Sequence, residues 1–477
     1  MDLSNYLLMK HELSLIATFL LLIVYDLFAS DNAKKYYYPV ACGIFLIHTV
    51  VCFFFKDEGI SFQGMYVTGP AYTLIKNILN IGVFIIFLQA KEWLSSADAI
   101  VKRGEFFMLI SMTLFGMYLM ISSGNFLLFY IGLETASLPM VALVAFDKYK
   151  KHSAEAGAKY IFNAIFSSAI LVFGLSFLYG ACGTLYYEDI ATTIYSTPLV
   201  IMAMVFILSG LFFKISLVPF HLWAADTYQG APTNVTLYLS TISKGAAAFA
   251  LMVILYNVFP VLAETWKVIC WILILLTITI GNLFALHQNN MKRFLAFSSI
   301  SQAGFIMLGL FTGTPLGMSS TIFYVFVYIF SNAAAFGVIS AIENQTGKIN
   351  MSDYDGLYKT NPRLALTMMV AMFSLGGIPF TAGFFSKMFV FMAAMEHPET
   401  SRIVLVVLAF LNTVISLFYY LKVVKAMFIH QSKTPLDSVN TDGYMKASLV
   451  ISLIGISAVG VISCFYEYMS SISFGIF

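Results

Sequence analysis

Long apolar runs recur along nearly the whole chain, and they constrain its fold more than any other feature. A helix needs about 20 mostly apolar residues to cross the hydrocarbon core of a bilayer, and about fourteen runs of this kind occur. None shows the strict alternation of apolar and polar residues that is typical of an outer-membrane barrel strand. The pattern predicts an all-α polytopic membrane protein with about fourteen transmembrane helices. The runs centre near Phe19, Phe45, Val83, Phe115, Thr135, Ile170, Phe206, Ser243, Leu276, Ala303, Ile329, Gly377, Val414 and Ile454.

The composition agrees with a membrane protein and excludes other classes. Of the 477 residues, 60% are hydrophobic and only 10% are charged, whereas a soluble protein carries about 25% charged residues. So few charges could not cover a water-facing surface, which excludes a globular enzyme and a disordered chain. The net charge of +2 gives no basic face for a nucleic acid, so we expect lipid and protein partners. The five cysteines have no ligand-type spacing, and we expect no metal or cofactor in this chain.

Two of the apolar runs carry internal breaks. The seventh continues past Pro219 to about Tyr228, and the twelfth is interrupted at Gly376-Gly377-Ile378-Pro379. Proline inside a helix removes a backbone hydrogen bond and clashes with the preceding turn. In a membrane, such a break persists only where it is buried in protein or lines a wet cavity. We therefore expect helices 7 and 12 to be discontinuous for a functional reason.

The basic residues in the connections predict the orientation. When each connection is numbered by the run before it, the odd connections hold most of the lysines and arginines. The even connections and the N-terminus hold only Lys10, Lys56, Lys267 and Arg402. Positive residues stay on the cytoplasmic side of a membrane. The sequence thus predicts a multi-pass protein of the inner (cytoplasmic) membrane with both termini on the outer (periplasmic) side.

Four charged residues lie deep within the apolar runs, namely Glu134, Lys214, Lys244 and Lys387. Each such charge costs roughly 2.5–3.5 kcal/mol at the centre of a membrane helix unless it is paired or hydrated. One structural explanation is a single Glu–Lys pair that holds helices together, but it leaves two central lysines without a carboxylate. The functional explanation is a proton relay, in which a lysine with a movable carboxylate partner changes its charge. We expect Glu134 to pair with Lys214.

Other polar residues give weaker signals. His221 and Asp226 follow the Pro219 break and either join a path between Lys214 and Lys244 or satisfy the broken backbone. Lys76 lies near the start of the third run, and we expect it to snorkel to the interface. The tenth run carries polar residues that either hold water or pack against neighbouring helices. These are Ser298, Ser299, Ser301 and Gln302.

Several motifs together resemble the antiporter-like subunits of respiratory complex I, which are related to Mrp-type cation/proton antiporters. The resemblance spans roughly residues 105–430. The motifs are Leu133-Glu134-Thr135, the segment from Lys214 to Thr233 with its Val-Pro-Phe-His-Leu-Trp core, the segment Met291–Gln302, and the segment Gly377–Lys387.

The resemblance implies a division of the chain. Residues 1–104 would form helices 1–3, residues 105–260 a first repeat (helices 4–8), residues 261–430 a second, inverted repeat (helices 9–13), and residues 431–477 helix 14. The sequence carries a weak sign of two repeats, because Leu217-Val-Pro-Phe220 and Gly377-Ile-Pro-Phe380 occupy the two breaks. An offset of five helices is odd, so the repeats would have opposite orientations.

The resemblance also implies roles for the buried charges. Glu134 and Lys214 would form a switching pair, Lys244 would be the central lysine, and Lys387 the terminal lysine of the second half-channel. The chain would translocate protons, driven by quinone reduction in other membrane and peripheral subunits that hold FMN, iron–sulfur clusters and quinone.

Within the family, two features favour the subunit N branch. The chain lacks the long C-terminal lateral helix expected of subunit L. It carries lysine at position 387, where subunit M and one Mrp subunit would typically carry glutamate. The alternatives are a subunit of a cation/proton antiporter or of a membrane-bound hydrogenase, and a non-conducting scaffold.

Overall fold

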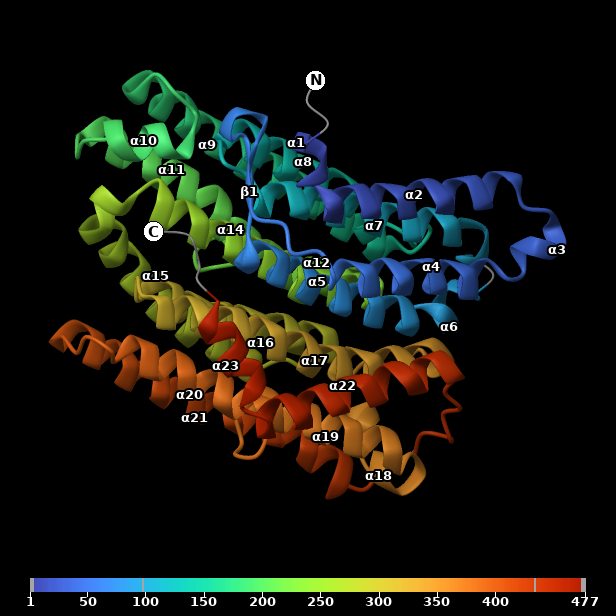
Figure 1. Ribbon diagram of the computed structural model, residues 1–477. Helices are drawn as coiled ribbons and strands as arrows, with labels where there is room; N and C mark the ends of the chain where they lie inside the picture. Colours follow the sequence, from blue (N-terminus) through green and yellow to red (C-terminus); the bar gives the residue numbers. More distant parts are fainter. Residues whose placement is uncertain (1–3, 97, 433–434, 473–477) are drawn as a thin grey trace.

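The computed structural model describes residues 4–96, 98–432 and 435–472, which form a bundle of long helices (Figure 1). In this part of the chain, 12 helical segments are long and apolar enough to cross a membrane. They are α2 (Lys10–Phe28), α5 (Pro70–Gln89), α7 (Arg103–Ile121), α8 (Phe126–Val144), α9 (Lys151–Cys182), α11 (Pro198–Ile215), α13 with α14 (Thr233–Asn257), α15 (Ala263–Leu286), α16 (Met291–Phe311), α17 (Pro315–Thr346), α21 (Thr400–Phe428) and α22 (Gly443–Val461).

Three shorter apolar helices complete the set: α4 (Tyr37–Cys52), α19 (Pro362–Gly376) and α20 (Ala382–Ala394). Each predicted apolar run coincides with one of these helices, and the twelfth run coincides with α19 and α20. The prediction of an all-α membrane protein is confirmed, while the number of membrane passes stays a prediction.

The remaining elements are short. An antiparallel hairpin of β1 (Gly59–Ser61) and β2 (Tyr66–Thr68) joins α4 to α5, and the apolar pattern did not predict it. The short helices are α1 (Ser4–Leu7), α3 (Asp31–Lys34), α6 (Lys91–Leu94), α10 (Tyr187–Thr193), α12 (Leu222–Gly230), α18 (Leu357–Thr360) and α23 (Cys464–Ser471).

Short helices of the odd connections and of one even connection lie at opposite ends of the bundle. Figure 1 shows α3, α6 and α18 at one end and α10 at the other. The first three belong to odd connections and carry Lys34, Lys91 and Lys359, so we call this the lysine-rich end. The positions of these four helices agree with the predicted alternation, and the orientation of the chain stays a prediction.

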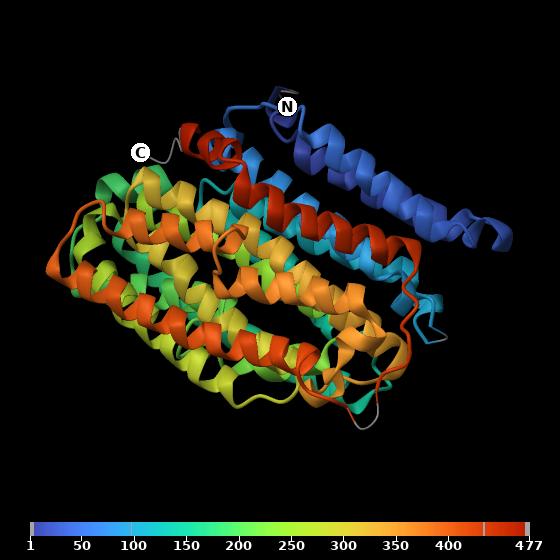
Figure 2. The same cartoon turned by 90° about the horizontal axis from the view of Figure 1, so that it is seen from below.

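The helices differ in how deeply they are buried. α16 and α17 are buried along their whole apolar length, and the segment of α13 and α14 is nearly so. In contrast, α2 and α4 lie along one flank of the bundle (Figure 2). Lys244, which the resemblance implies to be the central lysine, thus belongs to one of the innermost helices.

Close helix packing in the first half depends on small residues. Gly116 of α7 and Gly132 of α8 face each other's helix, and a Cβ atom at either would lie within 2.5 Å of the opposing backbone. Small residues allow membrane helices to approach in this way. This contact fixes α8, which carries Glu134, against α7.

Both predicted breaks are present and have the same local form. α11 ends at Ile215 and α12 begins at Leu222, while α19 ends at Gly376 and α20 begins at Ala382. The residue after each first half-helix is left-handed, with φ of 64° at Ser216 and 81° at Gly377. The next amide then donates to the carbonyl five residues earlier, as in the Schellman motif. These bonds are Leu217 to Phe212 and Ile378 to Phe373.

Candidate functional site, a series of buried lysines

Lys214 lies in the last turn of α11, directly before the first break. Its Nζ donates a hydrogen bond to the hydroxyl of Ser137 on α8. That hydroxyl donates in turn to the backbone carbonyl of Leu133. Among the described residues, no carboxylate lies within ion-pair distance of Lys214. The ammonium is therefore held by a neutral group.

Glu134 does not contact Lys214, so the predicted direct pair is absent from this structure. Its Oε1 accepts a hydrogen bond of 2.5 Å from the hydroxyl of Ser168 on α9. Glu134 and Ser137 are three residues apart on α8 and so lie on the same face. Because Ser137 binds the Lys214 ammonium, the Glu134 carboxylate remains one helical turn away from it. It lines a surface groove of about 480 Å³, together with Tyr130, Ile165, Ser168, Ala169, Val172, Phe173 and Ser176.

Lys244 is the first residue of α14 and is only 1% exposed. A π-helical turn, Leu239–Ser243, precedes it, and such turns occur often at functional sites. Its Nζ donates to Ser299 of α16, to the hydroxyl at 2.9 Å and to the carbonyl at 3.1 Å. The ring centre of Tyr228 lies 5.8 Å from the same nitrogen. Lys244 thus also has neutral partners.

Lys387 lies on α20, directly after the second break, and is 4% exposed. Its Nζ donates to two carbonyls at the end of α19, Leu375 at 2.9 Å and Gly376 at 3.1 Å. The last carbonyls of a helix have no partner within that helix and attract cations. The break therefore creates the binding site for this ammonium.

Polar side chains of α16 connect the neighbourhoods of Lys244 and Lys387. Ser298, next to the serine that binds Lys244, is 2.5 Å from the hydroxyl of Tyr420. Gln302 donates to Tyr420 at 3.0 Å and to the carbonyl of Leu375 at 3.1 Å. Leu375 therefore accepts from both Gln302 and Lys387. A cavity of about 10 Å³, lined in part by these last two side chains, adjoins the path, and a water molecule needs about 10–15 Å³.

The two weaker candidates, Asp226 and His221, have different surroundings. Asp226 on α12 pairs with Arg293 at 2.6 Å and with Lys159 at 2.7 Å, so it does not bridge Lys214 and Lys244. His221, just before α12, is buried, and its Nδ1 has no hydrogen-bond partner among the described residues.

Lys76 is fully buried, and the prediction that it snorkels is wrong. Its Nζ lies 2.6 Å from Oε1 of Glu12, and both side chains are fully buried. The hydroxyl of Tyr66, on β2, lies 2.8 Å from the other oxygen of Glu12 and 3.2 Å from Lys76. The hairpin thus helps to close this site, and α2 begins early enough to bring Glu12 into the bundle.

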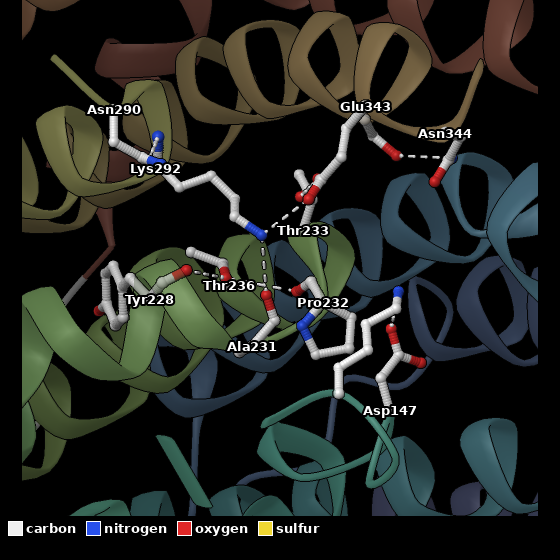
Figure 3. Close-up of polar contacts among 12 residues, drawn as sticks. Asp147, Tyr228, Ala231, Pro232, Thr233, Thr236, Asn290, Lys292, Glu343 and Asn344 are labelled. Carbon is white, nitrogen blue, oxygen red and sulfur yellow. Dashed lines mark hydrogen bonds and ion pairs between the residues drawn. The ribbon is translucent and has the colours of Figure 1, made fainter. Parts of the chain in front are cut away.

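A second ion pair, buried only on its lysine side, lies at the lysine-rich end (Figure 3). Lys292, in the first turn of α16, donates to Oε1 of Glu343 at 3.0 Å and to the carbonyl of Ala231 at 3.1 Å. The hydroxyl of Thr233 donates to Oε2 of Glu343. The pair joins α16 and α17 to the turn between α12 and α13.

Sequence reasoning named Ser299 but missed Ser137 and Ser168, because a lone serine in an apolar helix has no signal of its own. Ser137 and Ser168 become visible only when α8, α9 and α11 are packed together. Glu343, which the sequence analysis did not single out, lies near the end of α17, which continues to Thr346. Among the described residues, no group of three or more His, Cys, Asp or Glu side chains could hold a metal ion.

Comparison with known proteins agrees with the resemblance. The family described as NADH:quinone oxidoreductase/Mrp antiporter, TM, matches residues 123–416. NADH-quinone oxidoreductase subunit N of Azobacteroides pseudotrichonymphae is 52% identical over 100% of this chain and 99% of its own length. The protein of the same name from Phocaeicola vulgatus is 53% identical over 98% of this chain and 99% of its own.

A solved structure agrees with both. A chain in respiratory complex I from Thermus thermophilus with bound aureothin has a TM-score of 0.79 and 27% identity, covering 95% of this chain and 98% of that one. The chain therefore belongs to the NADH:quinone oxidoreductase/Mrp antiporter family, and its relatives place it in the subunit N branch.

Proposed function

We propose that this chain is a proton-translocating membrane subunit of NADH–quinone oxidoreductase. It moves protons through a relay of Glu134, Lys214, Lys244 and Lys387, driven by quinone reduction in other subunits. The observation that carries the proposal is that all three lysines lie on apolar helices of the bundle and bind neutral partners. A charge at such a depth costs roughly 2.5–3.5 kcal/mol.

Neutral partners suit a group that gains and loses a proton. The hydroxyls of Ser137 and Ser299 accept a hydrogen bond from a lysine ammonium and donate one to the neutral amine. A carboxylate in the same place would favour the charged form alone. Lys214 and Lys244 can therefore change charge without losing their hydrogen-bond partner.

The proposed transfer runs from Lys214 to Lys244 and on to Lys387. Glu134 lies one turn from the Lys214 site, so movement of either side chain changes the charge that the lysine experiences. From Lys244, the polar groups of α16 lead to the carbonyl of Leu375, which also binds Lys387. His221 and Asp226 stay outside the relay as we describe it.

The proposed orientation places the lysine-rich end in the cytoplasm and both termini on the outer side. It is supported by the distribution of loop lysines and arginines. A single cysteine in place of Lys150, in a cysteine-free variant, should be shielded from an impermeant thiol reagent in intact cells. Labelling from outside would reverse the orientation.

The groove at Glu134 supports a place within a larger complex. A carboxylate that faces lipid at mid-membrane is costly, so a partner subunit is expected to cover it. We assign FMN, the iron–sulfur clusters and quinone to partner subunits. The division into helices 1–3, the two repeats 105–260 and 261–430, and helix 14 belongs to the same proposal.

Proton pumping by the whole complex tests the function. The complex carrying Lys244→Ala should assemble and lose pumping in inside-out vesicles, when rates are normalised to the amount of complex. Pumping at the wild-type rate would leave only a scaffold role. Co-purification without NADH-binding and iron–sulfur subunits would favour an antiporter.

A further inference from the structure

Glu343 is the acidic half of the ion pair at the lysine-rich end, and the relay described above does not use it. Its side chain is 27% exposed, whereas that of Lys292 is 4% exposed. The carboxylate therefore reaches water on one side and the protein interior on the other. Figure 3 shows it between α17 and the turn that begins α13.

Both oxygens of this carboxylate are engaged, which fixes its position. Oε1 accepts from Lys292 and Oε2 accepts from Thr233. Lys292 has a second acceptor in the carbonyl of Ala231. The lysine therefore keeps a hydrogen bond when the carboxylate is protonated and turns away.

Buried polar atoms continue inward from this pair along α12 and α13. Asn234 follows Thr233 in the chain, and neither its Oδ1 nor its Nδ2 has a hydrogen-bond partner among the described residues. The hydroxyl of Thr227 also has no hydrogen-bond partner among the described residues. Asn234 is 1% exposed and Thr227 is fully buried. Buried polar atoms of this kind are normally satisfied by ordered water.

The inner end of this line reaches Lys244. The hydroxyl of Tyr228, on α12, also has no hydrogen-bond partner among the described residues, and this tyrosine lies beside the Lys244 ammonium. The tyrosine ring itself lies 5.8 Å from that nitrogen. Thr233 of α13 contacts the Glu343 carboxylate and Tyr228 of α12 lies beside Lys244, so the groups that require water belong to the two helices that join these sites.

We propose that Glu343 is the group that takes up protons from the aqueous phase for Lys244, and this rests on the proposed function. The carboxyl O–H bond of protonated Glu343 breaks, and water molecules held by Asn234 and Tyr228 pass the proton inward. An N–H bond forms on the neutral Lys244 amine. The carboxylate returns to Lys292 and takes its next proton from water at the lysine-rich end.

The test compares Glu343→Gln with a matched control in the assembled complex. Asp355 has a side chain that is 25% exposed and pairs with His430 at 3.1 Å, so Asp355→Asn removes a similar carboxylate that has no inward path. Glu343→Gln should slow pumping about tenfold or more and increase the solvent isotope effect in D₂O, because uptake becomes limiting. Glu343→Asp should recover part of the rate, and Asp355→Asn should change neither quantity.

Two results would overturn the inference. One is wild-type pumping by Glu343→Gln, and the other is slow pumping with an unchanged isotope effect, which indicates a structural role. Lys244→Met in the same preparations separates the two proposals, because the proposed function itself fails if that variant pumps normally. If Glu343→Gln does not assemble, Thr233→Val keeps the charge and removes one hydrogen bond. It should still increase the isotope effect, and an unchanged value again overturns the inference.

Discussion

Lysines inside the helix bundle have two kinds of partner. In the N-terminal helices, Lys76 forms an ion pair of 2.6 Å with Glu12, and both side chains are fully buried. Beyond residue 105, Lys214, Lys244 and Lys387 bind hydroxyls and backbone carbonyls. No carboxylate among the described residues lies within ion-pair distance of these three.

The difference indicates that the charge of its binding partner, and not its depth in the bundle, separates a structural lysine from a proton-transporting one. An ion pair that is fully buried on both sides resists any change of charge, since removing one partner costs about 3–5 kcal/mol. A neutral partner imposes no such requirement. The comparison therefore predicts that Lys76 maintains the fold, whereas the other three carry protons.

The largest effect on pumping is expected at Lys244. Replacing it with methionine removes the proton carrier from the innermost helices, and no other lysine contacts Ser299 among the described residues. Pumping in inside-out vesicles should be lost, while the amount of assembled complex stays near that of the wild type. Retained pumping would show that the relay bypasses Lys244.

A loss of pumping that is large, but smaller than that at Lys244, is expected at Glu134 and Lys214. Either Glu134→Ala or Lys214→Ala should strongly lower pumping, because each removes a charge that the other senses across one helical turn. Electron transfer by the complex should fall as well where the two steps are tightly coupled. If both variants assemble and pump at the wild-type rate, these residues are structural.

Lys387 should respond in a graded way. Lys387→Ala should impair pumping severely, and Lys387→Glu should retain a measurable part, because a carboxyl group can still accept and lose a proton. Lys387→Arg should behave like alanine, since a guanidinium keeps its proton at physiological pH. Vesicle pumping assays normalised to assembled complex measure all three. Full activity in the arginine variant would mean that Lys387 supplies only fixed charge.

The smallest effect on pumping, but a large one on stability, is expected at Lys76. Lys76→Met leaves Glu12 unpaired and should lower the stability of the subunit by about 3–5 kcal/mol. The double variant Glu12→Gln/Lys76→Met should recover most of that loss. Thermal unfolding of the purified complex measures both. An equally unstable double variant would show that the hydrogen bonds of the pair matter more than its charges.

The sequence predicted the broad fold well, because apolar length and proline position act locally. Long apolar runs marked the helices, Pro219 and Pro379 marked the breaks, and the cost of a buried charge pointed to Lys244 and Lys387. In each case the relevant physics depends on one segment and the solvent around it.

The partners of those charges could not be predicted, because they depend on packing between segments. Whether Lys76 snorkels or pairs depends on the packing of α2, whose Glu12 is 64 residues away in sequence, and on the hairpin that holds Tyr66 beside them. Whether Lys214 meets Glu134 or Ser137 depends on one turn of α8. The partner of Lys292 was not predictable either, because Glu343 lies on α17, 51 residues away in sequence.

One paired measurement tests the central claim most directly. Proton pumping is measured in the same vesicle preparation for Lys244→Met and for the double variant Glu12→Gln/Lys76→Met, each normalised to assembled complex. The account predicts loss of pumping in the first and wild-type pumping in the second. Loss of pumping in the double variant, or normal pumping in Lys244→Met, would contradict the claim that the partner of a buried lysine determines its role.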